Sequence, residues 1–351
     1  MHHRVLDAAI PAERAEWLAL WERWPGREVF AHPEYVRLFA RPCDRAVCAV
    51  GEDESGAILF PLVLRPLAEE PWAPPGERRF DAVSPYGYGG PFAFGGGARD
   101  DESFWRAHAG YCREAGILST FVRLSLFEAQ LPRLPGSVEA RGPNVVRALG
   151  PNVAAIWMEY ERSVRANVKT AERSGVEIDV DRSGARLEAF MEVYEHTMRR
   201  RGANGWYFFP RSFFEDLVRN LAGQFVFFHA LHAGEVVSSE LVLISREHAY
   251  MFLSGTTAEA YPLRPNDLLR HRTVEWAAAE GLRSYVLGGG YQPGDGVYRH
   301  KKNFAPRGQL PFRVACLTHD EAAARELEER RAAAGGAGWV PRPGYFPRYR
   351  G

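Results

Sequence analysis

The sequence of 351 residues contains only four cysteines, and none of them stands in a Cys-x-x-Cys pair. No cysteine has the ligand neighbours of a zinc site, and the eleven histidines show no His-x-x-x-His spacing. The composition therefore indicates reduced thiols, as in a cytoplasmic protein, and it predicts no bound metal ion. The four cysteines are Cys43, Cys48, Cys112 and Cys316.

Long hydrophobic runs are also absent. No apolar stretch approaches the roughly 20 residues that a membrane-spanning helix needs. The segment Met1–Asp7 lacks the apolar core of a signal peptide, so the sequence predicts neither export nor a membrane span. We therefore expect the protein to be cytoplasmic.

Neither sign of charge is in excess. Lys and Arg number 44, Asp and Glu number 44, and the formal net charge is zero. This balance argues against a protein that coats nucleic acid, but it leaves a local basic groove open, because binding follows the local potential. With 46% hydrophobic residues, a chain of this length can bury a large core without disulfide or metal support.

Common catalytic and cofactor signatures are missing as well. The chain has no Gly-x-Ser-x-Gly motif and no cysteine–histidine constellation for nucleophilic catalysis. Gly288, Gly289 and Gly290 follow a predicted strand, but no helix start lies where a Rossmann turn would need one. We interpret these glycines as a place where the backbone approaches a substrate or a neighbouring strand.

Helices and strands are predicted to alternate in both halves of the chain. The second half reads helix, helix, three antiparallel strands, helix and strand, which is the order of the acetyltransferase-type (GNAT) α/β fold. The first half has a looser version of it, so we predict an α/β fold of two GNAT-like domains with mixed, mainly antiparallel sheets. The main second-half elements are helices over 159–174 and 265–281 and strands over 224–231, 236–245, 248–254 and 284–287.

The pattern breaks near residue 150, at the turn-forming run 149–152. The sequence therefore predicts a degenerate N-terminal GNAT-like domain over 1–150 and a C-terminal GNAT-like domain over 151–318. Residues 319–351 are expected to form a charged helix followed by an irregular tail rich in proline and glycine.

Several segments, taken in order, resemble one family. Arg162 to Val176 is similar to the Arg-x-Asn-x-x-Lys helix of the Fem aminoacyltransferases, and the run Tyr194 to Phe208 resembles the helix and loop that follow it. The block from Ser238 to Phe304 is the strongest match, with Asp295-Gly296 and Lys301-x-x-Phe304 near its end. The resemblance covers most of the chain, because the loop 84–91 and the helix start at 32–35 fit the family's first domain.

The resemblance implies a tandem-GNAT transferase without a resident cofactor. Family members use an aminoacyl-tRNA to acylate an amine, usually on a peptidoglycan precursor, and relatives act in natural-product pathways or as general N-acyltransferases. Some Fem proteins carry a long coiled-coil arm, and this sequence has no heptad pair for one. We therefore expect amide formation on an amine-bearing acceptor, with aminoacyl-tRNA as the preferred donor and partner.

Lys301 is the first candidate for catalysis. The family's matching Phe-Lys-x-x-Phe lysine is held to stabilise the developing oxyanion, although His300 replaces the usual aromatic residue here. Lys302 stands beside it, so the functional lysine is one of these two, and a solvated charge run is the alternative. Glu240 lies in a predicted strand, half-buried, where a raised pKa would suit a general base or an arginine partner would hold it.

The remaining candidates are polar residues that we assign to binding. Arg162, Arg165 and Lys169 repeat at helical spacing and form either a basic stripe for a phosphate-bearing ligand or an ordinary exposed face. The motifs and the tyrosine-rich loop give the candidate acceptor-binding residues Arg165, Asn167, Lys169, Tyr86, Tyr88, Tyr207, Asp295 and Tyr298. Basic residues that could together form one cleft give the candidate tRNA- or donor-binding residues Arg199, Arg264, Arg270 and Lys302.

Two alternatives stay open. The first is an N-acyltransferase of a polysaccharide or metabolite pathway that uses acyl-CoA as donor. It is weakened because the segment after Leu253 lacks the glycine-rich pyrophosphate loop of acyl-CoA enzymes. The second is a tandem-GNAT protein that only binds a ligand, which the retained Asp295 and Lys301 motif argues against.

Overall fold

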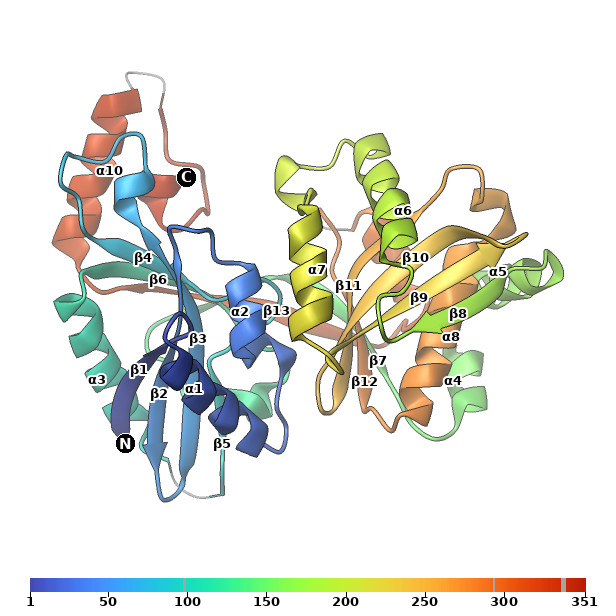
Figure 1. Cartoon of the computed structure of the whole chain (residues 1–351), viewed down its shortest axis with the longest axis horizontal. Coiled ribbons are helices and arrows are strands. Elements are labelled where there is room, and N and C mark those ends of the chain that lie inside the picture. Colours follow the sequence, from blue (N-terminus) through green and yellow to red (C-terminus); the bar gives the residue numbers. More distant parts are fainter. Residues whose placement is uncertain (97–98, 293, 336–338) are drawn as a thin grey trace. The chain divides into compact units, whose positions relative to one another are not determined.

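A computed structural model describes the whole chain except residues 97–98, 293 and 336–338. The chain forms two compact units, one of Met1–Arg141 with Phe312–Gly351 and one of Gly142–Pro311. Each unit is built around a mixed sheet flanked by helices, as the sequence predicts (Figure 1). In the described residues no helix is long and apolar enough to cross a membrane.

The sheet of the first unit is antiparallel apart from one neighbouring pair, β4 and β6. Strands β2 (Arg45–Asp53) and β3 (Gly56–Pro66) form a hairpin, and the carboxylate of Asp53 accepts the amides of Ser55 and Gly56 in its turn. Strand β5 (Phe92–Phe94) adds to β3. In spatial order the other strands are β1 (His2–Asp7), β2 (Arg45–Asp53), β3 (Gly56–Pro66), β4 (Phe80–Val83), β6 (Ile117–Arg123) and β13 (Gln309–Thr318).

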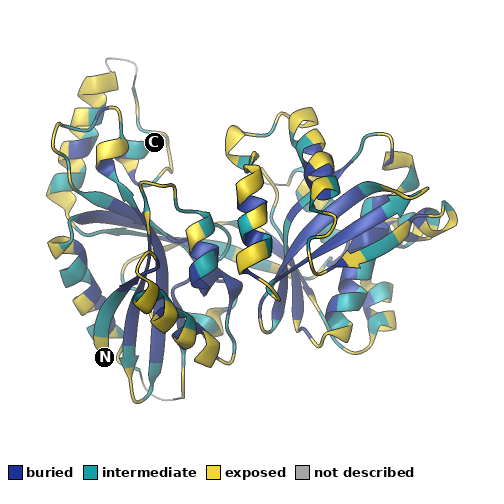
Figure 2. Cartoon of the chain, in the orientation of Figure 1, coloured by how far each residue is buried: buried dark blue, intermediate teal, exposed yellow. Residues whose placement is uncertain are grey.

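Aromatic and aliphatic side chains fill the core of the first unit. Phe60 of β3 packs against Trp105, and Phe104 lies buried beside them. The burial colouring shows the pattern, with strands buried and the outer helix faces exposed (Figure 2). The helices of this unit are α1 (Pro11–Arg23), α2 (Pro33–Leu38), α3 (Asp101–Glu114) and α10 (Glu321–Gly335).

The C-terminal segment is an integral part of the first unit. We expected residues 319–351 to be an extension, of which 336–338 lie outside the described residues. Leu327 of α10 and Tyr349 are instead buried against Leu67 and Leu118. The Tyr349 hydroxyl lies 2.8 Å from the Ser119 hydroxyl, so hydrogen bonding and apolar burial hold the segment in place.

The sheet of the second unit has the same design, with one parallel pair, β11 and β12. Strands β9, β10 and β11 form the antiparallel series that the sequence predicts. In spatial order the strands are β7 (Val138–Ala148), β12 (Ser284–Gly288), β11 (His248–Thr256), β10 (Glu235–Ile244), β9 (Phe225–His232) and β8 (Glu177–Asp181).

Alternation along β9 divides the core of the second unit between the two faces of the sheet. Val226 and Phe228 belong to the cluster formed with α5 and α8, whereas Phe227 faces the other way and packs on Phe190 of α6. The helices are α4 (Val153–Glu159), α5 (Arg162–Arg173), α6 (Leu187–Arg200), α7 (Arg211–Asn220), α8 (Pro265–Ala279) and α9 (Gly296–Lys302).

The helix expected over 159–174 is present as α5, and a separate short helix, α4, precedes it. Helix α4 ends at Glu159, Tyr160 adopts an extended backbone, and α5 begins at Arg162. Tyr160 is buried among aromatic side chains, including Phe304, so its packing redirects the chain between the two helices. The apolar stripe of α5, Val164, Val168 and Ala171, is buried as predicted.

Candidate active site

The candidate site of the second unit lies where the parallel strands β11 and β12 end. Because these strands run in the same direction, their carboxyl ends meet at one edge of the sheet. After β12 the chain passes through Gly288–Gly290 and enters α9, whose N-cap is Asp295. Three glycines and a short helix that ends in basic residues therefore lie at this edge of the sheet.

Asp295 organises this turn. Its Oδ1 accepts the amide of Tyr298 at 2.7 Å, and its Oδ2 accepts the amides of Tyr291 at 2.7 Å and Gln292 at 3.0 Å. Burial raises the pKa of Asp295, but these amide hydrogen bonds outweigh it and hold the pKa below its usual value. Asp295 is thus an ionised helix cap, which is a positioning role.

The glycines before α9 are needed for close approach. Gly288 has a left-handed backbone, with φ of 77°. A Cβ on Gly290 would lie 2.4 Å from Oδ1 of Asp295, so a larger residue there would displace the cap. The glycine run therefore brings the end of β12 against the helix cap.

Lys301 points back from α9 to the end of β12. Its Nζ donates a hydrogen bond of 2.8 Å to the main-chain oxygen of Gly289. Burial, with the nearby charge of Arg270, lowers the pKa of Lys301 to about 8, although Glu240 and Asp295 act in the opposite direction. The ammonium is thus fixed at the strand end, with a pKa close to neutrality.

Glu240 of β10 is fully buried, with 1% of its surface exposed, rather than half-buried as we expected. It accepts a hydrogen bond from the Tyr285 hydroxyl of β12, and its Oε2 lies 3.5 Å from Nε of Arg270. Burial raises the pKa of Glu240, and Arg270, Tyr285 and Lys301 each oppose that shift. Glu240 therefore has both features that the sequence suggested as alternatives, a raised pKa and an arginine partner.

Arg270 of α8 is buried and incompletely satisfied. Within the described residues its Nε and Nη1 have no hydrogen-bond partner, and its guanidinium lies 6.0 Å from the centre of the Phe304 ring. One turn before it on α8, Asp267 is also buried, and burial raises its pKa while Arg270 and Asn167 lower it. Buried polar atoms without hydrogen-bond partners are uncommon, which sets Arg270 apart from the surrounding core.

Sequence reasoning missed Tyr285 and Asp267. Tyr285 stands in an apolar strand, and its partner Glu240 is 45 residues away, so no local pattern connects them. Asp267 precedes Arg270 by three positions on a helix, and this spacing places both side chains on one face. That spacing was a signal available in the sequence.

The candidate residues of α5 have three different environments, and Arg165 has a structural role. Arg165 donates to the main-chain oxygens of Met158, at 3.2 Å, and Tyr160, and so it ties α5 to the end of α4. Lys169 is exposed on the same helix, and Asn167 contacts Asp267. Asn167 is therefore the α5 candidate that contacts the buried cluster of polar residues, by which we mean Glu240, Asp267, Arg270 and Tyr285.

The two remaining acceptor candidates of this unit lie on different elements. Tyr298 of α9 donates from its hydroxyl to Oε1 of Gln309 at 2.6 Å. The main-chain oxygen of Tyr207, in the segment between α6 and α7, accepts the hydroxyl of Tyr194 at 2.7 Å. Tyr298 thus belongs to the helix that carries Lys301.

The donor-binding candidates also have distinct environments. Arg199 is exposed and paired with Glu195 at 2.8 Å on its own helix. Arg264, exposed and with φ of 58°, precedes α8, and Lys302 is partly buried at the end of α9. Arg270 alone of these residues lies in the buried cluster with Glu240.

Tyr86 and Tyr88 belong to the first unit, in the loop after β4. The main-chain oxygen of Tyr86 accepts the Tyr35 hydroxyl at 2.9 Å, and its ring lies 6.0 Å from that of Phe39. Tyr88 packs edge-on against Phe30 and Phe312. The loop is therefore held by aromatic contacts at the carboxyl end of β4.

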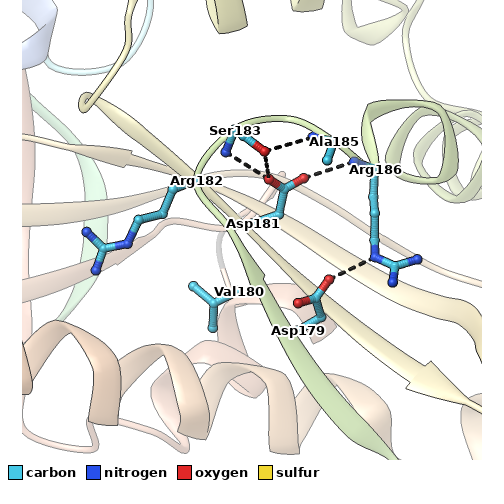
Figure 3. Close-up of a pocket in the computed structure, with 7 residues that line it drawn as sticks. All are labelled: Asp179, Val180, Asp181, Arg182, Ser183, Ala185 and Arg186. Carbon is cyan, nitrogen blue, oxygen red and sulfur yellow. Dashed lines mark hydrogen bonds and ion pairs between the residues drawn. The ribbon is translucent and has the colours of Figure 1, made fainter.

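A shallow pocket lies elsewhere in the second unit, at the turn after β8 (Figure 3). Its acidic residues are already engaged, because Asp181 accepts the amides of Ser183 at 2.8 Å and Arg186 at 2.9 Å. Asp179 pairs with the Arg186 side chain at 2.8 Å. These carboxylates therefore stabilise the turn after β8, and we assign the pocket no role in the reaction. Across the part of the chain that the structure describes, no cluster of three His, Cys, Asp or Glu could hold a metal ion.

Comparison with known proteins agrees with this architecture. Residues 159–302 match the family described as the acetyltransferase (GNAT) domain. This match supports an acyltransferase with a GNAT-type domain over residues 159–302. None of the curated proteins matches the chain.

The solved structures similar to this chain include FemX, with a TM-score of 0.63 and 14% identity over 93% of this chain and 99% of that one. The C-terminal domain of a putative lysylphosphatidylglycerol synthetase from Agrobacterium fabrum gives 0.54 and 15% over 93% and 100%. L-PGS from Bacillus licheniformis gives 0.54 and 15% over 86% and 90%. The chain therefore has the Fem-like tandem-GNAT fold that its motifs predict.

Proposed function

We propose that this protein is an aminoacyltransferase that moves an aminoacyl group from aminoacyl-tRNA to the amine of a small acceptor. The observation that carries the proposal is the Lys301 ammonium, held 2.8 Å from the Gly289 oxygen at the end of β12. The acceptor class we infer is a peptidoglycan-precursor-like or natural-product intermediate with a free amine. The Fem motifs in the sequence and the FemX-like fold support this choice.

The reaction requires a positive charge where the carbonyl oxygen becomes an oxyanion. The neutral amine attacks the ester carbonyl, the new C–N bond forms, and the C–O bond to the ribose breaks. The proton lost by the amine ends on the ribose oxygen. A fixed ammonium stabilises the tetrahedral oxyanion electrostatically, and this effect is large where water is excluded. Lys301 is held in that manner on a short helix whose cap, Asp295, is itself fixed.

The buried cluster behind Lys301 controls its charge. Glu240 raises the pKa of Lys301, whereas burial and Arg270 lower it. The Tyr285 hydroxyl holds the Glu240 carboxyl in place. We assign Glu240 the role of positioning this charge, and a general-base role for it stays a prediction of the sequence.

The names of the similar structures favour an aminoacyl donor. Lysylphosphatidylglycerol, in the name of one of the structures, is a molecule with an aminoacyl group joined to a lipid. The start of α8 does not present the free glycine-rich loop that a pyrophosphate needs. The Asp267 amide donates to the Arg264 oxygen at 3.2 Å, and the side chain of Asn266 accepts from Ser238 at 2.9 Å.

An acyl-CoA donor is the second candidate. It is favoured by the family match, which is to an acetyltransferase domain, and by the position of α8 as the next α-helix after β11. In that case the acceptor belongs to a polysaccharide or metabolite pathway. The same Lys301 ammonium would stabilise the oxyanion formed from a thioester.

Transfer assays with two donor pools distinguish these functions. Radiolabelled, mixed aminoacyl-tRNAs are incubated with the protein and an extract of small acceptors, with and without ribonuclease, in parallel with an acyl-CoA pool. We expect label in a small product, and its loss after ribonuclease treatment. Transfer only from acyl-CoA would establish the second candidate. No labelled product from either donor pool would support a protein that binds a ligand without catalysing transfer.

A further inference from the structure

The first unit has its own parallel strand pair, β4 and β6, in which Val83 pairs with Phe121. In the second unit the corresponding edge, at the ends of β11 and β12, carries the candidate active site. Ligands of open α/β sheets bind outside the carboxyl ends of the strands. The carboxyl edge of β4 and β6 is therefore a candidate for a second ligand-binding site.

Arg123 is the last residue of β6 and lies at this edge. Its main-chain amide donates to the Ser84 hydroxyl at 2.8 Å, and its Nη1 donates to the Ser84 main-chain oxygen at 3.1 Å. Its guanidinium also lies 5.1 Å from the centre of the Phe121 ring, on the same face of the strand. The side chain is thus held in one position by the neighbouring strand.

No carboxylate of the described chain lies within ion-pair distance of Arg123. Its neighbour Arg65, by contrast, pairs with Asp81 at 2.7 Å. Burial lowers the pKa of Arg123, as does the nearby charge of Arg65, whereas Tyr86, Tyr345 and Tyr35 act in the opposite direction. A partly buried cation without a counter-charge costs free energy, and such groups cluster at functional sites.

We propose that Arg123 binds an anionic group of the acceptor, a carboxylate or a phosphate, at the carboxyl edge of β4 and β6. The proposal rests on the proposed function for the identity of the ligand as acceptor. A guanidinium has five N–H donors in a planar fork that matches both anions, and Ser84 uses one of them.

Binding of simple anions tests this site without any transfer reaction. Inorganic phosphate and acetate are titrated separately into the whole protein at constant ionic strength, with chloride as the balancing anion, and the unfolding temperature is recorded. A ligand that binds only the folded state raises this temperature in a saturable manner. We expect saturation with at least one of the two anions in the wild type, and the responding anion identifies the ligand group.

Three variants localise the response. Arg123→Gln is expected to raise the apparent Kd by about tenfold or more, since a hydrogen bond to a charged group is lost. Arg123→Lys keeps the charge but loses the fork, so an intermediate Kd is expected. Arg106→Gln is the control, because Arg106 is exposed on α3 and paired with Glu102 at 2.9 Å.

Two results would overturn the inference: an unchanged Kd in Arg123→Gln, or no saturable response of the wild type to either anion. Far-UV circular dichroism without anion establishes that each variant is folded, and Arg123→Lys supplies the comparison if Arg123→Gln is not. The assay needs no donor and no transfer. A failure of the proposed aminoacyl transfer therefore leaves this test unaffected.

Discussion

Lys301 and Gly289 are joined by one hydrogen bond, from the ammonium Nζ to the main-chain oxygen, at 2.8 Å. The bond connects α9 to the end of β12, across the turn that Asp295 caps. It places a cation at the carboxyl edge of the parallel strand pair, with a pKa lowered by burial and by Arg270 to about 8. The predictions below follow from this arrangement.

The rate of transfer should depend on pH through Lys301. Its pKa of about 8 means that the ammonium is present below that pH and is lost as the pH rises through it. Initial rates are therefore expected to fall above about pH 8, on the alkaline side of a bell-shaped profile. In Lys301→Arg the cation persists to much higher pH, so the alkaline fall should disappear. An identical fall in both proteins would assign it to another group.

Lys301 should also make stability depend on pH, but stability should rise with pH where the transfer rate falls. The folded state releases the Lys301 proton near pH 8, whereas the unfolded chain holds it to the ordinary pKa of 10.5. Between these values the unfolded state binds more protons, so this lysine makes the free energy of unfolding rise with pH. Urea titrations should show the stability of the wild type rising relative to that of Lys301→Gln from pH 8 to pH 10.5. A constant difference would contradict the lowered pKa.

Gly290→Ala should disturb the site without touching Lys301. The new Cβ would lie 2.4 Å from Oδ1 of Asp295, and the cap of α9 must shift to admit it. A displaced helix moves the ammonium, and we expect transfer to fall by roughly 10- to 100-fold. Gly296→Ala is the matched control, because a Cβ there meets nothing within 4 Å. Equal activity of the two variants would mean that the cap does not position the site.

Tyr285→Phe should destabilise the protein because it removes the hydroxyl that donates to buried Glu240. Leaving a buried acceptor without its donor costs about 1–3 kcal/mol, and chemical denaturation measures the loss. Tyr298→Phe is the comparison, since its hydroxyl bonds Gln309 near the surface and its loss should cost less than about 0.5 kcal/mol. Equal losses would show that Glu240 does not depend on Tyr285.

Local patterns in the sequence were sufficient for the order of elements around the site. The antiparallel series β9, β10 and β11 and the helix α8 follow from periodicity, whereas Lys301 was singled out by the resemblance to the Fem motif. These features are local, or they repeat at the spacing of a helix or a strand. The α/β class and the tandem-GNAT arrangement were predictable for this reason.

Other features depend on partners that are distant in the sequence. Strand β7 contains Gly142 and Pro143, which weaken its strand pattern, and it forms by pairing with β12, whose Ser284 lies opposite Ala148. The buried cluster joins Glu240 to Tyr285 across 45 residues. The docking of Tyr349 on Ser119 spans 230 residues and escaped the sequence analysis for the same reason.

The central claim is that Lys301, and not its neighbour Lys302, stabilises the transition state of acyl transfer. The most direct test is a single-turnover assay with the active donor, comparing the wild type, Lys301→Gln and Lys302→Gln after each is shown to be folded. We predict a loss of roughly 100-fold or more for Lys301→Gln. Lys302→Gln should stay within about twofold of the wild type, as expected for a substitution outside the site. Full activity of Lys301→Gln, or equal losses in both variants, would contradict the account.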